Sequence, residues 1–274
     1  MLRSLKDFED YAIGAIDGTI GHVKDLYFDD DAWVIRYLVV DTGAWLASRR
    51  VLISPISIGK ADWAEKRLPV SITKEQVKNS PDIDTQRPVS RQQESQYLEY
   101  YGYPYYWVGT GVWGQGAYPN MMLPVMGSTD QSRRAQTPAA LSDVQALRSA
   151  GDDPHLRSCS EVMDYHIHAT DGDIGHVQGL LIDDDSWRVR YLIVDTSNWW
   201  LGHQVLIAPQ WIREVSWPDA KVAVNLTRQA VQDAPQYDPT ARLNRLQEAG
   251  IYKHYGHSPY WVNETIREAA TSRR

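Results

Sequence analysis

Two runs of three aspartates are the residues of this chain best suited to hold a hard metal ion. Asp29-Asp30-Asp31 and Asp183-Asp184-Asp185 each offer carboxylate oxygens, the ligands that calcium prefers. Neither run is followed by the glycine and glutamate that complete a helix–loop–helix calcium loop. Because aspartate is also a common turn former, we interpret each run as a solvated hairpin corner and predict no metal there.

Histidines form a second group that could do chemistry. His22 and His176 each follow a glycine, and His166 and His168 lie shortly before the second of them. His166, His168 and His176 together are metal-ligand candidates, but in the first half of the chain only His22 has a counterpart in this set. A metal needs three or four protein ligands, and unligated histidines are common, so we favour surface or structural roles and expect no metal.

A catalytic interpretation finds little support in the sequence. Asp41 and Asp195 each end an apolar stretch and precede a threonine, where a carboxylate accepts backbone N–H bonds in the next turn. A general base would need a partner acid, and none is apparent. The chain has no Gly-x-Ser-x-Gly nucleophile motif, phosphate loop or dinucleotide fingerprint. We therefore predict a protein that is not an enzyme, without catalytic residues and without a bound cofactor.

The elements that position these residues are short apolar stretches separated by Asp-Gly and Asp-rich corners, the pattern of antiparallel β-structure. From Trp33 to Val40 the side chains alternate between two faces, and the stretch from Trp187 to Val194 repeats the pattern. The preceding strands break this alternation near Lys24-Asp25 and Gln178-Gly179, which predicts a β-bulge or, alternatively, a short helical turn.

Helices follow the strands in each half. Thr73 and Thr227 are placed to cap short helices that stop before Pro81 and Pro235. Second helices are predicted over residues 90–100 and 244–254.

These features recur because the chain contains an internal repeat at a spacing of 154 residues. Asp17-Gly18-Thr19-Ile20-Gly21-His22-Val23 returns as Asp171-Gly172-Asp173-Ile174-Gly175-His176-Val177. So long a period predicts a duplicated domain rather than a solenoid unit. The predicted organisation is a first repeat with an aromatic tail, a Gly/Pro/Ser-rich linker, a second repeat with its tail, and a C-terminal tail, over residues 1–108, 109–154, 155–264 and 265–274.

Composition excludes some classes of function. The formal net charge is −7 and the cations are scattered, so we expect no nucleic-acid partner. Cys159 is the sole cysteine, which excludes an intrachain disulfide and suits a reducing cytoplasm. No apolar run reaches the length of a signal peptide or a membrane span, so we predict a cytoplasmic protein.

Residues 17–55 and 171–209 carry a family resemblance. The order Asp-Gly-x-Ile-Gly-x-Val, an Asp-rich corner, Arg-Tyr-Leu-Val/Ile-Val-Asp-Thr and Val-Leu-Ile-x-Pro resembles the PRC-barrel family, and the Tyr-Trp tails resemble bacterial tandem members. The family includes the cytoplasmic domain of the photosynthetic reaction-centre H subunit and the C-terminal barrel of the ribosome-maturation factor RimM. The resemblance implies a mainly β fold with short helices, in two small bent antiparallel β-barrels.

The function that we expect is a non-enzymatic docking or scaffold module of two PRC-barrels, acting in stress adaptation, with a protein partner of unknown identity. The alternatives are a binder of quinone-like small molecules and a peripheral component of a photosynthetic or electron-transport complex. We expect pseudo-twofold packing between the repeats, with a homo-oligomer as a further option. Aromatic residues of the two tails are interface candidates, although folding back over each barrel explains them better: Tyr101, Tyr103, Tyr106, Trp107, Tyr255, Tyr260 and Trp261.

Overall fold

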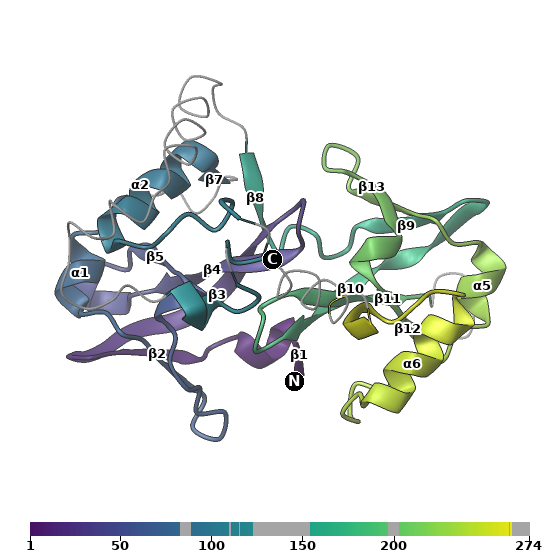
Figure 1. The fold of residues 1–274 in the computed structure, drawn as a ribbon, viewed down its shortest axis with the longest axis horizontal. Helices are drawn as coiled ribbons and strands as arrows, with labels where there is room; N and C mark the ends of the chain where they lie inside the picture. The colour runs from purple at the N-terminus through teal and green to yellow at the C-terminus, as the bar shows by residue number, and fades with distance from the viewer. Residues whose placement is uncertain are drawn as a thin grey trace, which may run out of the picture. The chain divides into compact units, whose positions relative to one another are not determined.

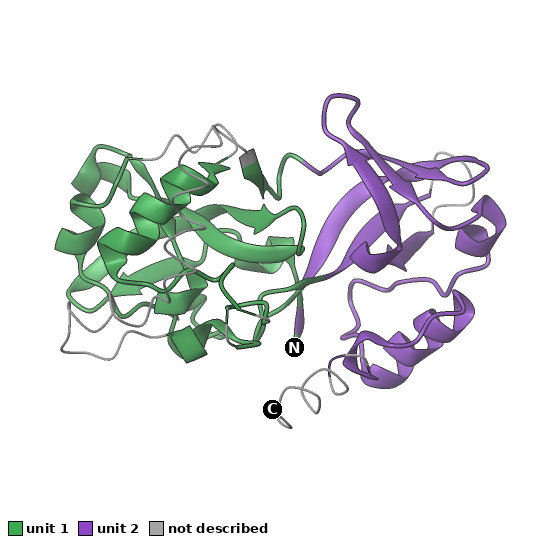
Figure 2. Cartoon of the chain, turned by 45° about the horizontal axis from the view of Figure 1, so that its top comes forward, with its two compact units in different colours: residues 1, 3–161, 182–189 green, residues 2, 162–181, 190–274 purple. Residues whose placement is uncertain are grey.

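A computed structural model of the chain describes residues 1–82, 89–109, 111–114, 116–122, 154–196, 203–262 and 264. The fold is mainly β with short helices, as the sequence predicts (Figure 1). The chain divides into two compact units (Figure 2). Unit 1 contains residues 1, 3–161 and 182–189, and unit 2 contains residues 2, 162–181 and 190–274. Unit 1 thus includes two short segments from the second sequence repeat.

The elements of the first part of the chain, up to Glu161, are mostly strands with 3-10 turns between them. In chain order they are β1 (Leu2–Ser4), η1 (Leu5–Phe8), β2 (Ala12–Ala15), β3 (Gly18–Asp29), β4 (Val34–Asp41), η2 (Gly43–Leu46), β5 (Arg50–Ile53), η3 (Pro55–Ser57), β6 (Arg67–Pro69), α1 (Lys74–Lys78), β7 (Val89–Ser90), α2 (Arg91–Tyr101), η4 (Pro119–Met122) and β8 (Pro154–Ser158).

The later elements follow a similar order. They are β9 (His166–Ala169), β10 (Gly172–Asp183), β11 (Val189–Asp195), β12 (Gln204–Ile207), η5 (Pro209–Trp211), β13 (Ile212–Ser216), β14 (Lys221–Val224), α5 (Arg228–Gln232) and α6 (Arg245–His254). Many of these elements begin 154 residues after an earlier one, as β3 and β10, α1 and α5, and α2 and α6 do.

Each unit is built around one sheet. In unit 1 the strand order is β5-β4-β3-β2-β6, with β8 paired to β3 and β7 paired to β8; in unit 2 the order is β12-β11-β10-β9-β14-β13. Most strand pairs are antiparallel, as the sequence predicts, but β2 pairs with β6 in parallel and β9 pairs with β14 in parallel. These parallel neighbours join segments far apart in sequence, which turn signals do not reveal. Among the described strands neither order closes on itself, so closure into a barrel stays a prediction.

The helix predictions are confirmed, because the local capping residues determine where each helix begins. The side chain of Thr73 accepts a hydrogen bond from the backbone of Gln76 at the start of α1, and Thr227 caps α5 in the same way. Ser90 caps α2 and Asn244 caps α6, each in a reciprocal capping box.

The predicted irregularity in β3 is a β-bulge. The register against β4 shifts between Val23 and Asp25, where the sequence pattern loses its alternation, and shifts again between Tyr27 and Phe28. Such bulges bend a strand and increase its twist. The corresponding prediction for Gln178-Gly179 of β10 stays a prediction.

The hairpin corner between β3 and β4 differs from the sequence expectation in one residue. Trp33 does not continue the strand: its φ is +53°, in the left-handed region, and Trp187 has a φ of +60°. The Trp33 N–H donates to the carbonyl of Asp29 at 2.8 Å, and the carboxylate of Asp29 accepts from the backbone N–H groups of Asp31 and Ala32. This tight turn accounts for the unusual backbone of a bulky residue.

Part of the expected linker packs on unit 1. We define the strap as residues 111–114 and 116–122, which include η4. Trp113 is buried and its indole N–H donates to the carbonyl of Ser186 at 2.9 Å, while Met122 is also buried. Residues 110, 115 and 123–153 of the predicted linker lie outside the described residues. None of the described helices is long and apolar enough to span a bilayer.

Two glycines explain part of the repeated Asp-Gly-x-Ile-Gly motif. A Cβ atom on Gly21 would lie 1.9 Å from the carbonyl oxygen of Asp41, and one on Gly175 would lie 1.9 Å from that of Asp195. No atom fits at such a distance, so the neighbouring backbone must approach a residue without a side chain. By contrast, a Cβ on Gly250 in α6 would meet nothing within 4 Å.

We therefore expect Gly21→Ala and Gly175→Ala each to lower the free energy of unfolding by about 2–3 kcal/mol, because the backbone must shift to admit a methyl group. Urea denaturation followed by far-UV circular dichroism measures this. The matched control is Gly250→Ala, which we expect to raise stability by about 0.5–1 kcal/mol, since alanine favours a helix. Equal effects of the three substitutions would contradict the close approach.

Candidate functional site

The main candidate site of unit 1 is a carboxylate enclosed in the protein. Glu94 of α2 is fully buried, and its two oxygens have separate partners. Oε1 accepts a hydrogen bond from the hydroxyl of Tyr37 at 2.9 Å. Oε2 lies 2.9 Å from Nε2 of His155 and 3.4 Å from Nη1 of Arg91. A buried carboxylate without such partners would be costly, so these contacts are a condition of its burial.

Local structure explains why these groups meet. Arg91 and Glu94 are three residues apart on α2, a spacing that places both on one helix face. Tyr37 comes from the middle of β4, and His155 comes from β8. The strands and the helix therefore each contribute one side of the enclosure.

An arginine and an aromatic ring extend this cluster. The guanidinium of Arg36 lies over the ring of Tyr106, 3.6 Å from its centroid, and donates to the carbonyl of Val112 at 2.8 Å. It also forms a buried ion pair with Asp29 at 3.3 Å. The hydroxyl of Tyr106 accepts from Arg91 at 2.8 Å. We name this set the Glu94 cluster: Asp29, Arg36, Tyr37, Arg91, Glu94, Tyr106 and His155.

Unit 2 contains a second set of the same chemistry, which we name the Glu248 cluster: Arg190, Tyr191, Arg245, Glu248, Tyr260 and Glu264. Its first five members each lie 154 residues after a member of the Glu94 cluster. Glu248 is buried and accepts from the hydroxyls of Tyr191 at 3.1 Å and Tyr260 at 3.2 Å. Arg190 lies 3.8 Å from the ring centroid of Tyr260.

The two clusters differ in the groups around the shared core. Arg190 pairs with Glu264 at 2.7 Å, whereas Arg36 pairs with Asp29. The side chain of Arg245 is largely exposed, but that of Arg91 is largely buried. The Glu94 cluster is therefore the more enclosed of the two.

The environment of these clusters shifts the ionisation of several members. Burial, reinforced by the charge of Glu94, raises the pKa of Tyr37 well above its ordinary value. Burial likewise raises the pKa of Tyr106, and it raises that of Tyr260 to about 12. These phenols stay protonated near neutral pH, and Tyr37 and Tyr260 donate hydrogen bonds to the buried glutamates, so the arrangement fits positioning better than acid–base chemistry.

Asp29 and Asp30 are adjacent, but their pKa values move in opposite directions. Burial acts to raise the pKa of Asp29, but the positive charge of Arg36 and the N–H of Ala32 outweigh it and lower the pKa. For Asp30, burial dominates over the hydrogen bond from Arg157, and its pKa is raised. The solvated corner expected from the sequence therefore contains a buried, structurally paired carboxylate at Asp29.

The aromatic interface candidates are largely internal. Tyr103, Tyr106, Tyr255 and Tyr260 are buried, which places most of the hydrophobic area of each tail inside its own unit. The remaining three candidates are half-buried: Tyr101, Trp107 and Trp261. Within the tails the rings pack on one another, as Tyr101 and Tyr103 do at 5.5 Å between centroids.

The candidate metal ligands occupy two kinds of place. In each aspartate run, three carboxylate oxygens lie within 4.8 Å of one another. Among the described residues, no other group of three candidate metal ligands lies so close together. His166, His168 and His176 lie on β9 and β10. The clusters around Glu94 and Glu248 were not singled out from the sequence. The signal available was a charged residue repeated within two predicted helices at the spacing of 154.

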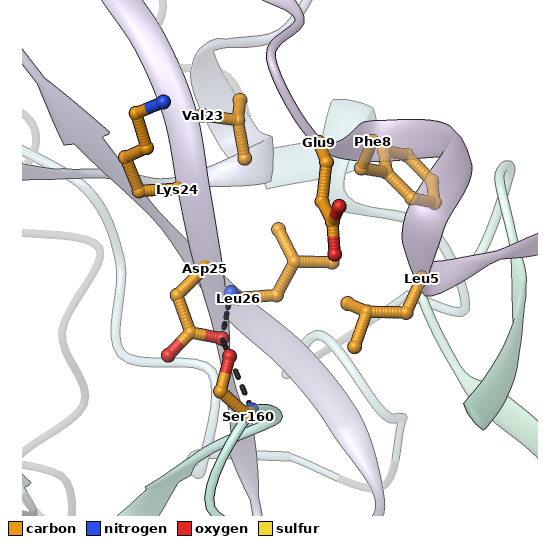
Figure 3. Close-up of a pocket in the computed structure, with 8 residues that line it drawn as sticks. All are labelled: Leu5, Phe8, Glu9, Val23, Lys24, Asp25, Leu26 and Ser160. Atoms are coloured by element: carbon orange, nitrogen blue, oxygen red, sulfur yellow. Dashed lines mark hydrogen bonds between the residues drawn. The ribbon is translucent and has the colours of Figure 1, made fainter. Parts of the chain in front are cut away.

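Unit 1 also has a small pocket beside β3 (Figure 3). Leu5, Phe8 and Leu26 supply its apolar walls. Asp25 at its edge accepts hydrogen bonds from the backbone of Leu26 at 2.8 Å and from the hydroxyl of Ser160 at 3.0 Å. The carboxylate of Asp25 is thus committed to holding the chain after β8 against β3.

We expect Glu94→Gln to lower the free energy of unfolding by about 3 kcal/mol, because it removes the charge that balances buried cations. Glu248→Gln should cost less, since Arg245 remains solvated. Urea denaturation monitored by tryptophan fluorescence measures both, with the exposed Glu65→Gln as control, for which we expect a change within about 0.5 kcal/mol. A loss at Glu94 no greater than at Glu65 would contradict the proposed electrostatic role.

The paired carboxylate of Asp29 predicts a specific acid dependence. Its folded-state pKa is lowered, so its stabilising contribution is fully present above the ordinary pKa of 3.8 and is lost as the pH falls through the lowered pKa. Asp29→Asn should therefore flatten the dependence of unfolding free energy on pH in this acid range. Asp30→Asn is the matched control and should leave the acid loss in place, because the pKa of Asp30 is shifted upward. The measurement is urea denaturation at a series of acid pH values.

Comparison with protein families identifies one segment of the chain. Residues 4–77 match the family described as the PRC-barrel domain. This segment covers β2 to β6 and nearly all of α1, and it includes Asp29, Arg36 and Tyr37 of the Glu94 cluster. A search of curated proteins gave no match. The chain therefore contains a PRC-barrel domain, which spans residues 4–77.

Proposed function

We propose that the protein is a non-enzymatic scaffold that docks a protein partner, and that the strap on unit 1 is part of the docking surface. The observation that carries this proposal is the exposure of two large side chains on an anchored segment. Tyr118 is 43% exposed and Met121 is 68% exposed. Tyrosine and methionine are enriched at protein–protein interfaces, where large flexible or amphipathic side chains adapt to a partner.

The strap is anchored on both sides of these residues. Trp113 is buried before them, and Pro119 and Met122 are buried beside them. Backbone hydrogen bonds between Gly111 and Gly114 and between Trp113 and Gly116 fold the strap into a compact turn. Since the anchors hold the backbone, a partner that binds Tyr118 and Met121 needs to order the two side chains but not the backbone beneath them.

The buried clusters support a structural role for the residues that the two halves share. Glu94 and Glu248 are each enclosed by hydroxyl and guanidinium donors, and the tyrosines around them stay protonated at neutral pH. A group committed to internal pairing is poorly placed to accept or deliver a proton to a substrate. This supports docking rather than catalysis.

A binder of quinone-like rings is less well supported. The tail aromatics that would line a ring pocket pack mainly on one another, as Tyr105 and Trp107 do with ring centroids at 4.9 Å. The pocket in Figure 3 has room for about one water molecule rather than an aromatic ring, and it has only one aromatic wall residue, Phe8.

The proposal places the protein in a bacterial cytoplasm, in a stress-adaptation role. Cys159 is a free and fully buried thiol, and burial raises its pKa well above the ordinary value. A lone, protonated thiol of this kind is compatible with a reducing compartment. Attachment to a photosynthetic or respiratory membrane complex would be docking of the same kind and is an outcome that the following experiment detects.

We expect the double substitution Tyr118→Ser with Met121→Ser to abolish recovery of the specific partner in crosslinking and affinity capture from the native cell, read by quantitative mass spectrometry. Folding should be retained, because both side chains are exposed. Leu246→Ser is the matched control: Leu246 is 86% exposed in unit 2 and its loss should leave capture intact. Undiminished capture by the strap variant would refute docking through the strap.

A further inference from the structure

One face of the hairpin β9–β10 in unit 2 carries three histidines. In the register of this pair, His166 lies opposite His176, and His168 lies opposite Asp173. The residues between them, Ile167 and Ile174, are fully buried. Because side chains alternate along a strand, the histidines share the solvent face while the isoleucines enter the core.

This placement brings imidazoles within reach of one ion. His166 and His168 are two residues apart on one strand and therefore point to the same side. His176 stands directly across from His166, where opposite Cβ atoms are separated by about 4.5–5.5 Å. Three imidazoles so arranged match the three protein ligands of an open zinc site, in which water fills the fourth position.

Asp173 contacts His168 through its carboxylate, as an orienting carboxylate usually does for a metal-binding imidazole. Its carboxylate lies 2.7 Å from Nδ1 of His168. A carboxylate that accepts the N–H of one ring nitrogen fixes the tautomer and leaves the other nitrogen as the ligand.

We propose that His166, His168 and His176 bind a divalent late transition metal of the zinc class, with Asp173 as the residue that orients His168. The three rings are not gathered within 4.8 Å as they stand, so binding requires side-chain rotation, which exposed or half-exposed histidines can undergo. Imidazole ligands favour zinc, nickel and copper over calcium and magnesium, which take oxygen ligands. Lys221 of β14 lies opposite His166 in the strand register, and the negative charge of Asp173 offsets the positive charge of this lysine.

Unit 1 lacks this arrangement and provides an internal comparison. In the equivalent hairpin, β2–β3, His22 lies opposite Ala12, and Thr19 lies opposite Gly14. Only one of the four positions there carries an imidazole. His22 is therefore an internal example of a histidine on a sheet without neighbouring imidazoles in the strand register.

Isothermal titration of the full chain with Zn²⁺ tests the proposal. We expect saturable binding with one ion per chain, weakened at least tenfold by His176→Ala and about tenfold by Asp173→Asn, which removes the orienting carboxylate. His22→Ala is the matched control and should leave the affinity unchanged. All three substituted positions are at least partly exposed, and circular dichroism of each variant verifies that it folds.

Three results of the Zn²⁺ titrations alone would overturn the proposal. They are the absence of saturable Zn²⁺ binding, binding that survives both His166→Ala and His176→Ala, and binding that is removed instead by Asp30→Asn or Asp184→Asn, which would assign the ion to an aspartate run. Excess Ca²⁺ should fail to displace Zn²⁺, since a hard cation gains little from imidazole. Full displacement by Ca²⁺ would also count against the histidine site.

Discussion

Enclosure of a carboxylate between the sheet and a helix is the constraint on which much of unit 1 depends. Glu94 is fully buried, so each of its oxygens must receive hydrogen bonds or a counter-charge from within the protein. Tyr37 of the sheet and His155 of β8 each contribute a hydrogen bond, and Arg91 of the same helix contributes a counter-charge. Meeting this requirement fixes α2, β4 and β8 with respect to one another. Apolar packing alone would tolerate more variation in those positions, because it is not directional.

A buried glutamate with tyrosine partners recurs in unit 2 with different neighbours. Comparing the two clusters separates the contacts that the fold requires from those that belong to one unit. Glu248 is enclosed by Tyr191 and Tyr260, as Glu94 is by its own tyrosine. In both clusters an arginine lies over a tyrosine ring. The guanidinium of Arg36 is 3.6 Å from the ring centroid of Tyr106 in unit 1, and that of Arg190 is 3.8 Å from the ring centroid of Tyr260 in unit 2. What the halves share is therefore internal support. Features found once among the residues that the structure describes, such as the strap and the three histidines of β9–β10, are the better candidates for an individual function.

Both proposals follow from this division between shared and individual features. The strap is held by buried Trp113 and presents Tyr118 and Met121 to solvent, which is the surface that we propose for docking. The histidine face of β9–β10 is set by strand register, with Asp173 bound to His168. The two features are independent, and neither requires a reaction at the buried carboxylates. The PRC-barrel domain at residues 4–77 supplies the framework without specifying either use.

Local patterns in the sequence were sufficient for the helices, the hairpin strands and the bulge in β3. Capping by Thr73 and Ser90 is a contact within one helical turn, and the loss of alternation near Lys24 is visible in the chain itself. The sequence did not reveal the parallel pairing of β2 with β6, the left-handed backbone at Trp33, or the enclosure of Glu94. Each of these depends on a partner distant in the chain or on a turn closed by neighbouring groups. The period of 154 residues shows which residues recur, but only tertiary structure decides whether a recurring glutamate faces water or a tyrosine hydroxyl, because burial is set by the elements packed around it.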